Sequence, residues 1–275
     1  MNTETKQYRI EKDSLGEVKV PVEAYYGAQT TRALENFPIS GIRPHPISTR
    51  SMVYIKKAAA KVNNELGCLD NEKSEAIINA ADRIIEGEFK DQFVVDVYQA
   101  GAGTSFNMNV NEVISNIAIE SLGWKKGNYS VIHPNDHVNL GQSTNDVFPA
   151  TMRISALYLL KGLFPVVDAL VKSFNKKANE FDKTIKSGRT HLQDAAPITL
   201  GQEFSGYADA VSKSAKKIKK ASDTLKELGI GGTAVGTGLN SHPDYKERII
   251  KELQKVTNLD IRGAANYFEA MQSNA

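Results

Sequence analysis

The segment from 186 to 204, KSGRTHLQDAAPITLGQEF, separates two long runs of regularly spaced apolar residues. Its glycines and its proline interrupt regular structure, so the segment is typical of a connection between two helices. Thr190 and His191 are adjacent in it, and Gln193 and Asp194 follow closely. A hydroxyl, an imidazole, an amide and a carboxylate together suit a small polar ligand. A capped helix–helix turn with one solvated histidine is the alternative interpretation.

Apolar residues recur at steps of three and four on both sides of this segment. They are Leu157, Leu160, Phe164, Val167, Val171, Phe174, Ala178 and Phe181 before it, and Phe204, Ala208, Val211, Ala215, Ile218 and Leu225 after it. This spacing predicts two paired helices, built on 142–181 and 190–228, each roughly 40 Å long. Pro165 is expected to kink the first of them. Paired helices of this length indicate a long central helix bundle.

The first 140 residues predict a small mixed domain. Residues 9–13 and 18–20 are expected to pair as short strands, and the apolar spacing after them indicates helices. Asp70 is expected to cap one helix, which Gly87 ends. The expected fold is therefore mainly α, with an N-terminal domain at 1–140 and a helical bundle at 141–275 that is truncated at its C-terminal end.

A second polar stretch contains the sequence GAGTSFNMNVN at 101–111. A loop of small residues that leads into a helix presents free N–H groups to an anion, and a carboxylate serves as well as a phosphate. Thr104 or Ser105 is expected to cap this helix. Capping does not explain the three alternating asparagines that follow, which are poor helix formers. These asparagines are Asn107, Asn109 and Asn111.

A third polar stretch, HPNDHVNLGQSTNDVFP at 133–149, precedes the long apolar helix. Ser143, Thr144 and Asn145 are consecutive short donors at the predicted start of that helix, where the helix dipole also favours an anion. Two histidines near Asp136 raise the alternative of a metal site. Their spacing is not the H-E-x-x-H pattern of a zinc-binding helix, so no metal is expected.

Glycines are dense in the sequence GIGGTAVGTGLN at 229–240, which superficially resembles a dinucleotide-binding loop. That interpretation fails because the segment follows a predicted helix instead of a strand. We expect a glycine-rich turn in which backbones pack closely. A helix should then begin at Pro243, with Ser241 or His242 as its cap.

The composition excludes several classes of protein. The net charge of +2 gives no electrostatic footprint for nucleic acid. Cys68 is the only cysteine, so no disulfide can form within the chain. The first residues have no apolar core of a signal peptide, and we expect no apolar run long enough to span a bilayer. These features predict a cytoplasmic enzyme or binding protein without nucleic-acid or membrane partners.

The three polar stretches share threonine, serine, asparagine and glycine beside predicted helix ends. Neutral donors and helix N-termini can stabilise a doubly charged carboxylate-derived intermediate without a cofactor. Together with residues 231–240, these motifs resemble the fumarase/aspartase superfamily, and the resemblance extends from Arg9 to Ala275. It implies β-elimination of fumarate from a substituted succinate, in a homotetramer whose active sites are shared between subunits.

The resemblance also implies roles for individual residues. His191 is implied as a catalytic acid/base group. The implied substrate contacts are Thr104, Ser143, Thr144, Asn145, Thr190 and His191. A secondary dicarboxylate site is implied at His133, Asn135 and Asp136.

One departure from the family concerns its mobile loop, Gly-Ser-Ser-x-Met-Pro-x-Lys-x-Asn-Pro, which carries the serine base and a carboxylate-binding lysine. This motif is absent from the 275 residues. We therefore expect the chain to be the larger, N-terminal part of such an enzyme, with little or no activity alone. An inactive scaffold subunit is the non-enzymatic alternative.

Local residues favour the aspartase branch of the family, which converts L-aspartate to fumarate and ammonia. Ala102 and Thr144 stand where fumarases usually carry serine, and residues 24–27 and 96–99 lack the tryptophan of the fumarase versions. A missing hydroxyl at position 102 removes a donor for a water leaving group. Residues 231–232 and 268–271 are more similar to fumarase, so fumarate hydratase is the second expectation.

Overall fold

The computed structural model describes residues 7–273. The chain divides into two compact units: the first extends to Ser155 and resumes at Lys226, and the second is Ala156–Leu225. These units are a different division from the expected domains at 1–140 and 141–275, and that expectation stays a prediction.

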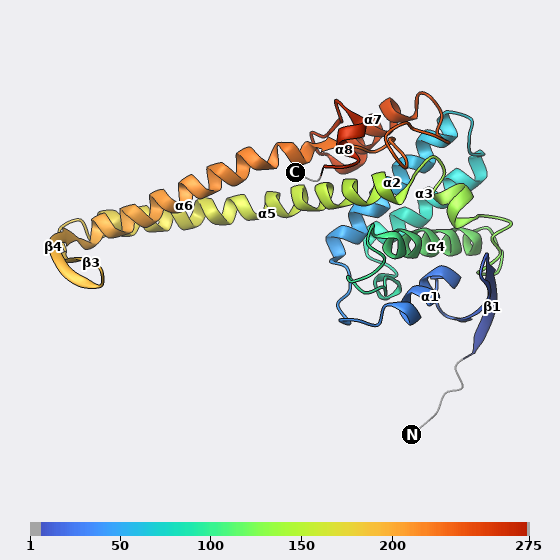
Figure 1. The fold of residues 1–275 in the computed structure, drawn as a ribbon, viewed down its shortest axis with the longest axis horizontal. Helices are drawn as coiled ribbons and strands as arrows, with labels where there is room; N and C mark the ends of the chain where they lie inside the picture. Colours follow the sequence, from blue (N-terminus) through green and yellow to red (C-terminus); the bar gives the residue numbers. More distant parts are fainter. Residues whose placement is uncertain (1–6, 274–275) are drawn as a thin grey trace, which may run out of the picture. The chain divides into compact units, whose positions relative to one another are not determined.

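The fold is mainly α, as predicted (Figure 1). The helices assigned to the first unit are α1 (Ala28–Asn36), α2 (Pro46–Glu65), α3 (Asn71–Glu86), α4 (Thr104–Ser121), α7 (Tyr245–Thr257) and α8 (Tyr267–Ala270), with short turns of helix η1 (Lys90–Gln92) and η2 (Pro134–Val138). The long helix α5 (Thr144–Glu180) begins in the first unit and continues into the second.

Several helix ends follow from local sequence. Asp70 accepts a hydrogen bond from the backbone N–H of Lys73 and caps α3, and Gly87 ends that helix with φ +105°, both as predicted. The expected caps of α4 are wrong, because Gly103 occupies the cap position without a side-chain bond and Thr104 is already helical. The predicted start at Pro243 is also wrong: α7 begins at Tyr245, after Asp244.

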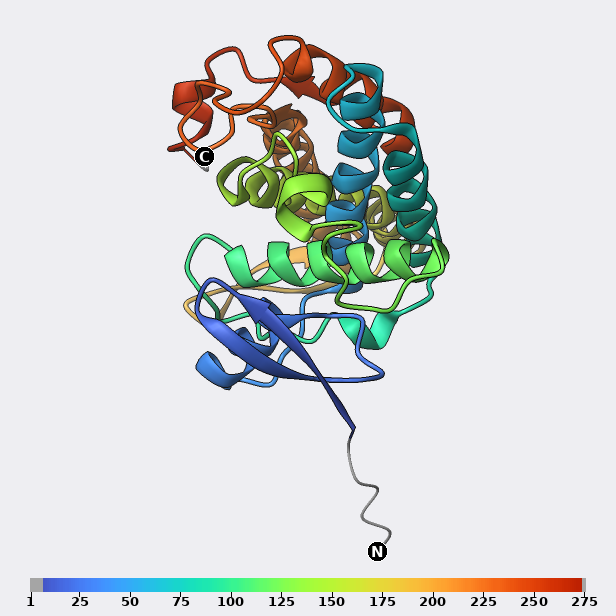
Figure 2. The same cartoon turned by 90° about the vertical axis from the view of Figure 1, so that its right-hand side faces the viewer.

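The short strands of the first unit form two small sheets. Strands β1 (Tyr8–Asp13) and β2 (Gly16–Pro21) pair antiparallel, which confirms the predicted hairpin (Figure 2). Strands β5 (Glu227–Leu228) and β6 (Arg262–Gly263) pair parallel. Since both sheets have only two strands, the core of this unit is built by helices.

The core of the first unit lies between α2, α3, α4 and α7. Met52, Ile55 and Ala59 of α2 are fully buried. Every residue of α4 from Ser105 to Ile119 is buried. Burial of apolar surface in such a helix contributes about 25 cal/mol per Å², which offsets the loss of conformational freedom. A helix buried on all sides can also hold its polar side chains away from water, which matters for the asparagines of α4.

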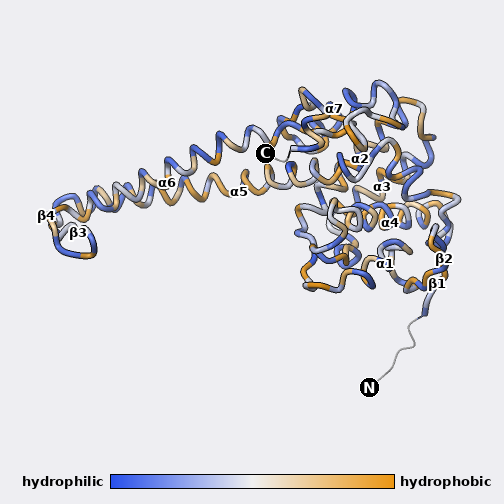
Figure 3. Tube along the Cα trace, viewed as in Figure 1, coloured by the Kyte–Doolittle hydropathy of each residue, from blue (hydrophilic) through white to orange (hydrophobic). Residues whose placement is uncertain are grey.

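In the second unit, α5 and α6 (Leu200–Ser222) run alongside each other, with apolar residues recurring along both (Figure 3). The ring of Phe204 lies 6.2 Å from that of Phe174 and 5.9 Å from that of Phe181. The paired helices are confirmed, but the expected helix start at 190 is wrong. Strands β3 (Ile185–Thr190) and β4 (Gln193–Thr199) form a hairpin there, and α6 starts at Leu200 because Thr199 and Gln202 form a capping box.

The expectation that no apolar run could span a bilayer is also wrong. Helix α5 is long and apolar enough to cross a membrane by length and composition. Residues 154–171 include only Lys161 and Asp168 as charged side chains. This is weak evidence for a membrane span, because helices in the core of water-soluble proteins also satisfy the criterion.

Candidate active site

Helices α4 and α5 begin side by side in the first unit. A Cβ atom added at Gly103 would lie 2.3 Å from the ring of Phe148, so only glycine permits this approach. The rings of Phe106 and Phe148 meet edge to face at 6.4 Å. Thr104 is exposed at the first turn of α4. In the described part of the chain, the backbone N–H groups of Thr104 and Ser105 have no hydrogen-bond acceptor, as is usual in the first turn of a helix.

The first turn of α5 brings Ser143, Thr144 and Asn145 together, as the sequence predicted. The N–H of Asn145 donates to Oγ of Ser143 at 3.2 Å. The amide of Asn145 donates to the carbonyl of Ala234 at 2.9 Å, which connects this turn to the glycine-rich segment. Asn145 is nevertheless exposed, and Ser143 and Thr144 are half-buried, so all three remain accessible to a small ligand.

Asp146 holds the same two segments together from the inside. It is 1% exposed and accepts hydrogen bonds from the backbone N–H groups of Ser143, Gly231 and Thr233 at 2.9–3.0 Å. Burial raises the pKa of Asp146 to about 6, although these N–H groups favour the carboxylate. The closely packed glycine-rich turn expected at 229–240 therefore serves to fix the start of α5.

Lys56 of α2 is completely buried behind these residues. Its Nζ donates to Oδ1 of Asn107 at 2.7 Å, to Oδ1 of Asn139 at 2.8 Å and to Oε1 of Gln142 at 3.0 Å. Burial lowers the pKa of Lys56 to about 7, opposed by the charge of Asp146. Three neutral oxygen acceptors make a buried ammonium tolerable where an isolated one would be expelled.

The ammonium sets the direction of the hydrogen bonds around it. Because an ammonium can only donate, the amide oxygen of Asn107 must face Lys56. The amide nitrogen of Asn107, Nδ2, then donates to Oγ1 of Thr144 at 3.1 Å. The hydroxyl of Thr144 accepts in that bond, which leaves its own proton to donate to a ligand. Lys56 thus orients Thr144 through two successive hydrogen bonds, both of which Asn107 makes.

The three asparagines of α4 now have structural roles. Asn107 links Lys56 to Thr144, and Asn111 donates to Asn139 at 3.2 Å. Asn109 accepts from the N–H of Val94 and donates to the carbonyl of Gln92, both at 3.0 Å. The side-chain amides therefore hold the preceding loop and the Lys56 network in place.

Sequence reasoning missed Lys56. The residue lies between Ile55 and Ala59, two fully buried members of the predicted apolar face. A lysine next to that face was a signal, but it could equally have extended to the surface. Asp146 lies within the polar stretch at 133–149, but its sequence position alone does not indicate its role.

His133, Asn135 and Asp136 are brought together at η2, where they make a local cap. Nδ1 of His133 accepts from the N–H groups of Asn135 and Asp136, both at 3.2 Å. An accepting nitrogen carries no proton, so the 3.3 Å approach of Asp136 Oδ2 to the same atom is not an ion pair. Nδ1 of His137 accepts from the N–H of His133, and burial lowers the pKa of His137. In the described residues, no group of three or more His, Cys, Asp and Glu side chains could hold a metal.

Thr190 and His191 belong to the second unit, at the tip of the β3–β4 hairpin. His191 and Leu192 form its two-residue turn, with φ of +50° and +61°, and Thr190 pairs with Gln193. Such turns require positive φ at both central residues, which costs a non-glycine residue about 1 kcal/mol or more. Both residues are exposed, with Leu192 at 91%.

The first unit thus presents two helix N-termini, the side chains of Thr104, Ser143, Thr144 and Asn145, and a buried ammonium behind them. Each helix N-terminus carries roughly half a positive charge. Helix N-termini and neutral donors arranged in this way are suited to carboxylate oxygens and to negative charge that develops on them. The donors of this site are neutral, apart from Lys56, which has no exposed surface.

Comparison with known proteins places these features in one family. Residues 16–275 match the family described as Lyase. The chain is 50% identical over 271 residues to fumarate hydratase class II of Halobacterium salinarum, covering 98% of this chain and 57% of that protein. It is 50% identical over 273 residues to aspartate ammonia-lyase of a Bacillus species, covering 99% and 58%.

Solved structures agree with the sequence comparison. Fumarate lyase:delta crystallin from Brucella melitensis bound to cobalt superposes with a TM-score of 0.93 at 44% identity, covering 96% of this chain and 58% of that one. Class II fumarase from Schistosoma mansoni gives 0.90 at 37% identity, covering 96% and 59%. The chain spans somewhat more than half the length of these relatives, and it belongs to the lyase family of the fumarase/aspartase superfamily.

Proposed function

We propose that the protein acts in cofactor-independent β-elimination on a succinate-type substrate, with L-aspartate as substrate and fumarate and ammonia as products. The observation that carries the proposal is the convergence of the α4 and α5 N-termini around Thr104 and Thr144. Their open N–H groups and hydroxyls suit the oxygens of a dicarboxylate.

The chemistry matches the charges of this site. Removal of the Cβ proton of the substrate places two negative charges on the adjacent carboxylate, and preorganised donors lower the barrier to that step. We assign this carboxylate to Thr104, Ser143, Thr144 and Asn145. Thr190 and His191 would contact the substrate from the second unit of a neighbouring subunit, with His191 as acid/base group.

Aspartate is proposed over malate because Ala102 offers no hydroxyl. In a closed site, a polar leaving group without its partner costs about 1–3 kcal/mol. Ala102 is exposed in the loop directly before α4, the helix whose start we assign to the substrate. The Bacillus aspartate ammonia-lyase at 50% identity is compatible with this choice.

Fumarate hydration is the second candidate, because the Halobacterium fumarate hydratase is equally identical to this chain. Rates of fumarate formation from L-aspartate and from L-malate, followed by ultraviolet absorbance, decide between them. Efficient turnover of malate with none of aspartate would overturn the aspartase proposal.

We further propose a homotetramer in the cytoplasm, with each active site shared between subunits. Exposed apolar side chains along α5 support an assembly that covers them: Leu159, Leu163, Val166 and Leu170 are 41–67% exposed. A catalytically inactive scaffold subunit would assemble in the same way but would release no fumarate. Light scattering on the purified chain gives the oligomeric state independently of activity.

The family's mobile-loop motif is absent from the 275 residues, so activity is best assayed after mixing the chain with a polypeptide that carries that motif. We call this mixture the complemented protein.

A further inference from the structure

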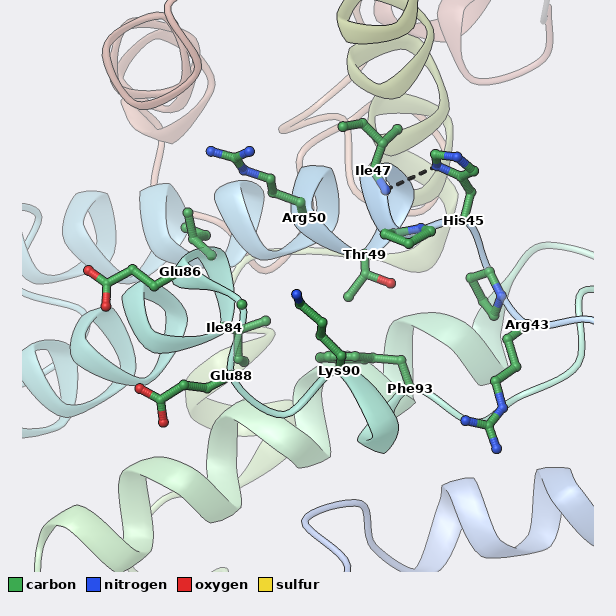
Figure 4. A pocket seen from close by; sticks show the side chains of 14 residues that line it. Arg43, His45, Ile47, Thr49, Arg50, Ile84, Glu86, Glu88, Lys90 and Phe93 are labelled. Atoms are coloured by element: carbon green, nitrogen blue, oxygen red, sulfur yellow. Dashed lines mark hydrogen bonds between the residues drawn. The ribbon is translucent and has the colours of Figure 1, made fainter.

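A pocket of about 580 Å³ lies in the first unit, away from the starts of α4 and α5. It is bordered by the first turn of α2, the last turn of α3 and η1, and it is open on one side (Figure 4). Its lining is mostly apolar, with Ile47, Ile84 and Phe93 among the walls. A volume of this size accommodates a small organic molecule.

Two polar groups face the interior of this pocket. Lys90 extends its ammonium group towards Thr49 and Ile84 (Figure 4). The end of its side chain lies so close to the backbone of Gly87 that a Cβ atom there would be 3.2 Å from Nζ. Within the described residues, Lys90 makes no ion pair with an acidic side chain.

Thr49 is the second polar group. It lines the pocket and is 7% exposed, and its hydroxyl makes no hydrogen bond to any described residue. Its oxygen is not among the fully buried polar atoms that lack a partner, so part of it is accessible and can donate to a ligand oxygen. Thr49 and Lys90 therefore offer two donors to one acceptor group.

The charges around the pocket favour an anion. Arg43 and Arg50 lie at its rim, and neither has an acidic partner among the described residues. Of the two acidic residues that line it, Glu88 is already paired with Arg83 at 2.7 Å, which leaves Glu86. Three cationic groups against one free carboxylate make the rim net positive.

We propose that this pocket binds a monocarboxylate with an apolar body. The carboxylate would accept from Nζ of Lys90 and from the hydroxyl of Thr49, and the body would lie on Ile47, Ile84 and Phe93. A dicarboxylate suits the pocket less, since the second carboxylate would lie on apolar walls.

The pocket shares two wall residues with a smaller cavity beside the candidate active site. Pro44 and His45 line the pocket and also line this cavity of about 170 Å³, whose other walls include Gln99, Phe106 and Phe148. Phe106 and Phe148 are the residues that pack where α4 and α5 begin. The binding proposal itself is independent of any activity of the protein.

Isothermal titration calorimetry of the chain with 2-naphthoate tests the proposal, with the neutral 2-naphthamide as the matched ligand. We expect a Kd of about 1 mM or below for the carboxylate and at least roughly tenfold weaker binding of the amide. Lys90→Met should weaken naphthoate binding by about tenfold or more, and Thr49→Val by about threefold or more.

Two control variants separate the ligand contacts from general effects. Thr49→Ser keeps the hydroxyl and should retain binding, and Lys172→Met removes an exposed lysine of the second unit and should leave the Kd unchanged. Circular dichroism verifies that each variant is folded. Absence of binding, equal binding of the amide, or a Kd unaffected by both Lys90→Met and Thr49→Val would overturn the proposal.

Discussion

Lys56 and Asn107 are 51 positions apart in the sequence, and Nζ of Lys56 donates a 2.7 Å hydrogen bond to Oδ1 of Asn107. Both residues are buried, and the bond fixes which side of the Asn107 amide faces Thr144. A helix that supplies no substrate contact of its own therefore controls the direction of a hydroxyl in the proposed site.

Lys56→Met should uncouple this network. The substitution leaves the amide oxygens of Asn107 and Gln142 without their donor, so we expect a loss of about 2 kcal/mol in the free energy of unfolding, measured by urea denaturation. In the complemented protein, kcat/KM should fall by about tenfold or more because Thr144 loses its orientation. Lys57→Met is the matched control, since Lys57 pairs with half-exposed Asp82, and it should change neither quantity appreciably.

The free energy of unfolding should fall with rising pH in acid, because of Asp146, and rise with rising pH in base, because of Lys56. Asp146 has a raised pKa in the folded state, so its contribution is fully present below its ordinary pKa near 3.8 and is lost as the pH rises through about 6. Lys56 has a lowered pKa, so its contribution is present above its ordinary pKa near 10.5 and is lost as the pH falls through about 7.

The combined contribution of Asp146 and Lys56 to the free energy of unfolding should therefore be smallest between about pH 6 and pH 7. Urea denaturation of the chain at several pH values measures it. Subtracting the same profile for Lys56→Met isolates the rise above pH 7. If the difference between the two profiles is flat from pH 7 to pH 10, the lowered pKa of Lys56 is refuted.

Gly103→Ala should be one of the most damaging conservative changes in the first unit. Its new Cβ would lie 2.3 Å from the ring of Phe148, at a backbone φ of +80° that alanine adopts poorly. We expect a destabilisation of about 2 kcal/mol or more. Gly101→Ala is the control, because no atom lies within 4 Å of the added Cβ. Equal unfolding free energies for both variants would contradict the close approach of α4 and α5.

The place of His191 in the turn and the chemistry of its imidazole can be tested separately. His191→Asn keeps a residue that tolerates positive φ but removes the imidazole. Stability should be retained, while kcat/KM of the complemented protein should fall by roughly 10²-fold. His242→Ala serves as the control histidine variant. Unchanged kinetics for His191→Asn would leave the imidazole with no part in catalysis.

Much of the fold was predictable from local signals. The period of the apolar residues predicted α5 and its pairing with α6, and Asp70 and Gly87 marked the ends of α3. The hairpin at 185–199 was not predicted, because its glycine and proline indicated only an interruption. Its register depends on pairing across the turn, with Thr190 opposite Gln193, which no local pattern reveals.

The candidate site was predictable only in part. Ser143, Thr144 and Asn145 were identified because donors at a helix start have a recognisable pattern. Lys56 was missed because its function depends on Asn107, Asn139 and Gln142, which come from distant parts of the sequence. Contacts of this kind arise from tertiary packing, so they become visible only in the folded chain.

Fumarate release by complementation tests the central claim most directly. The chain and a polypeptide with the family's mobile-loop motif are assayed separately and together with L-aspartate, with ultraviolet absorbance following fumarate. We predict that fumarate appears in the mixture at a rate at least about 10²-fold above that of either component alone. A mixture that assembles by light scattering yet releases no fumarate, from aspartate or from malate, would contradict the claim that this chain contributes a β-elimination site.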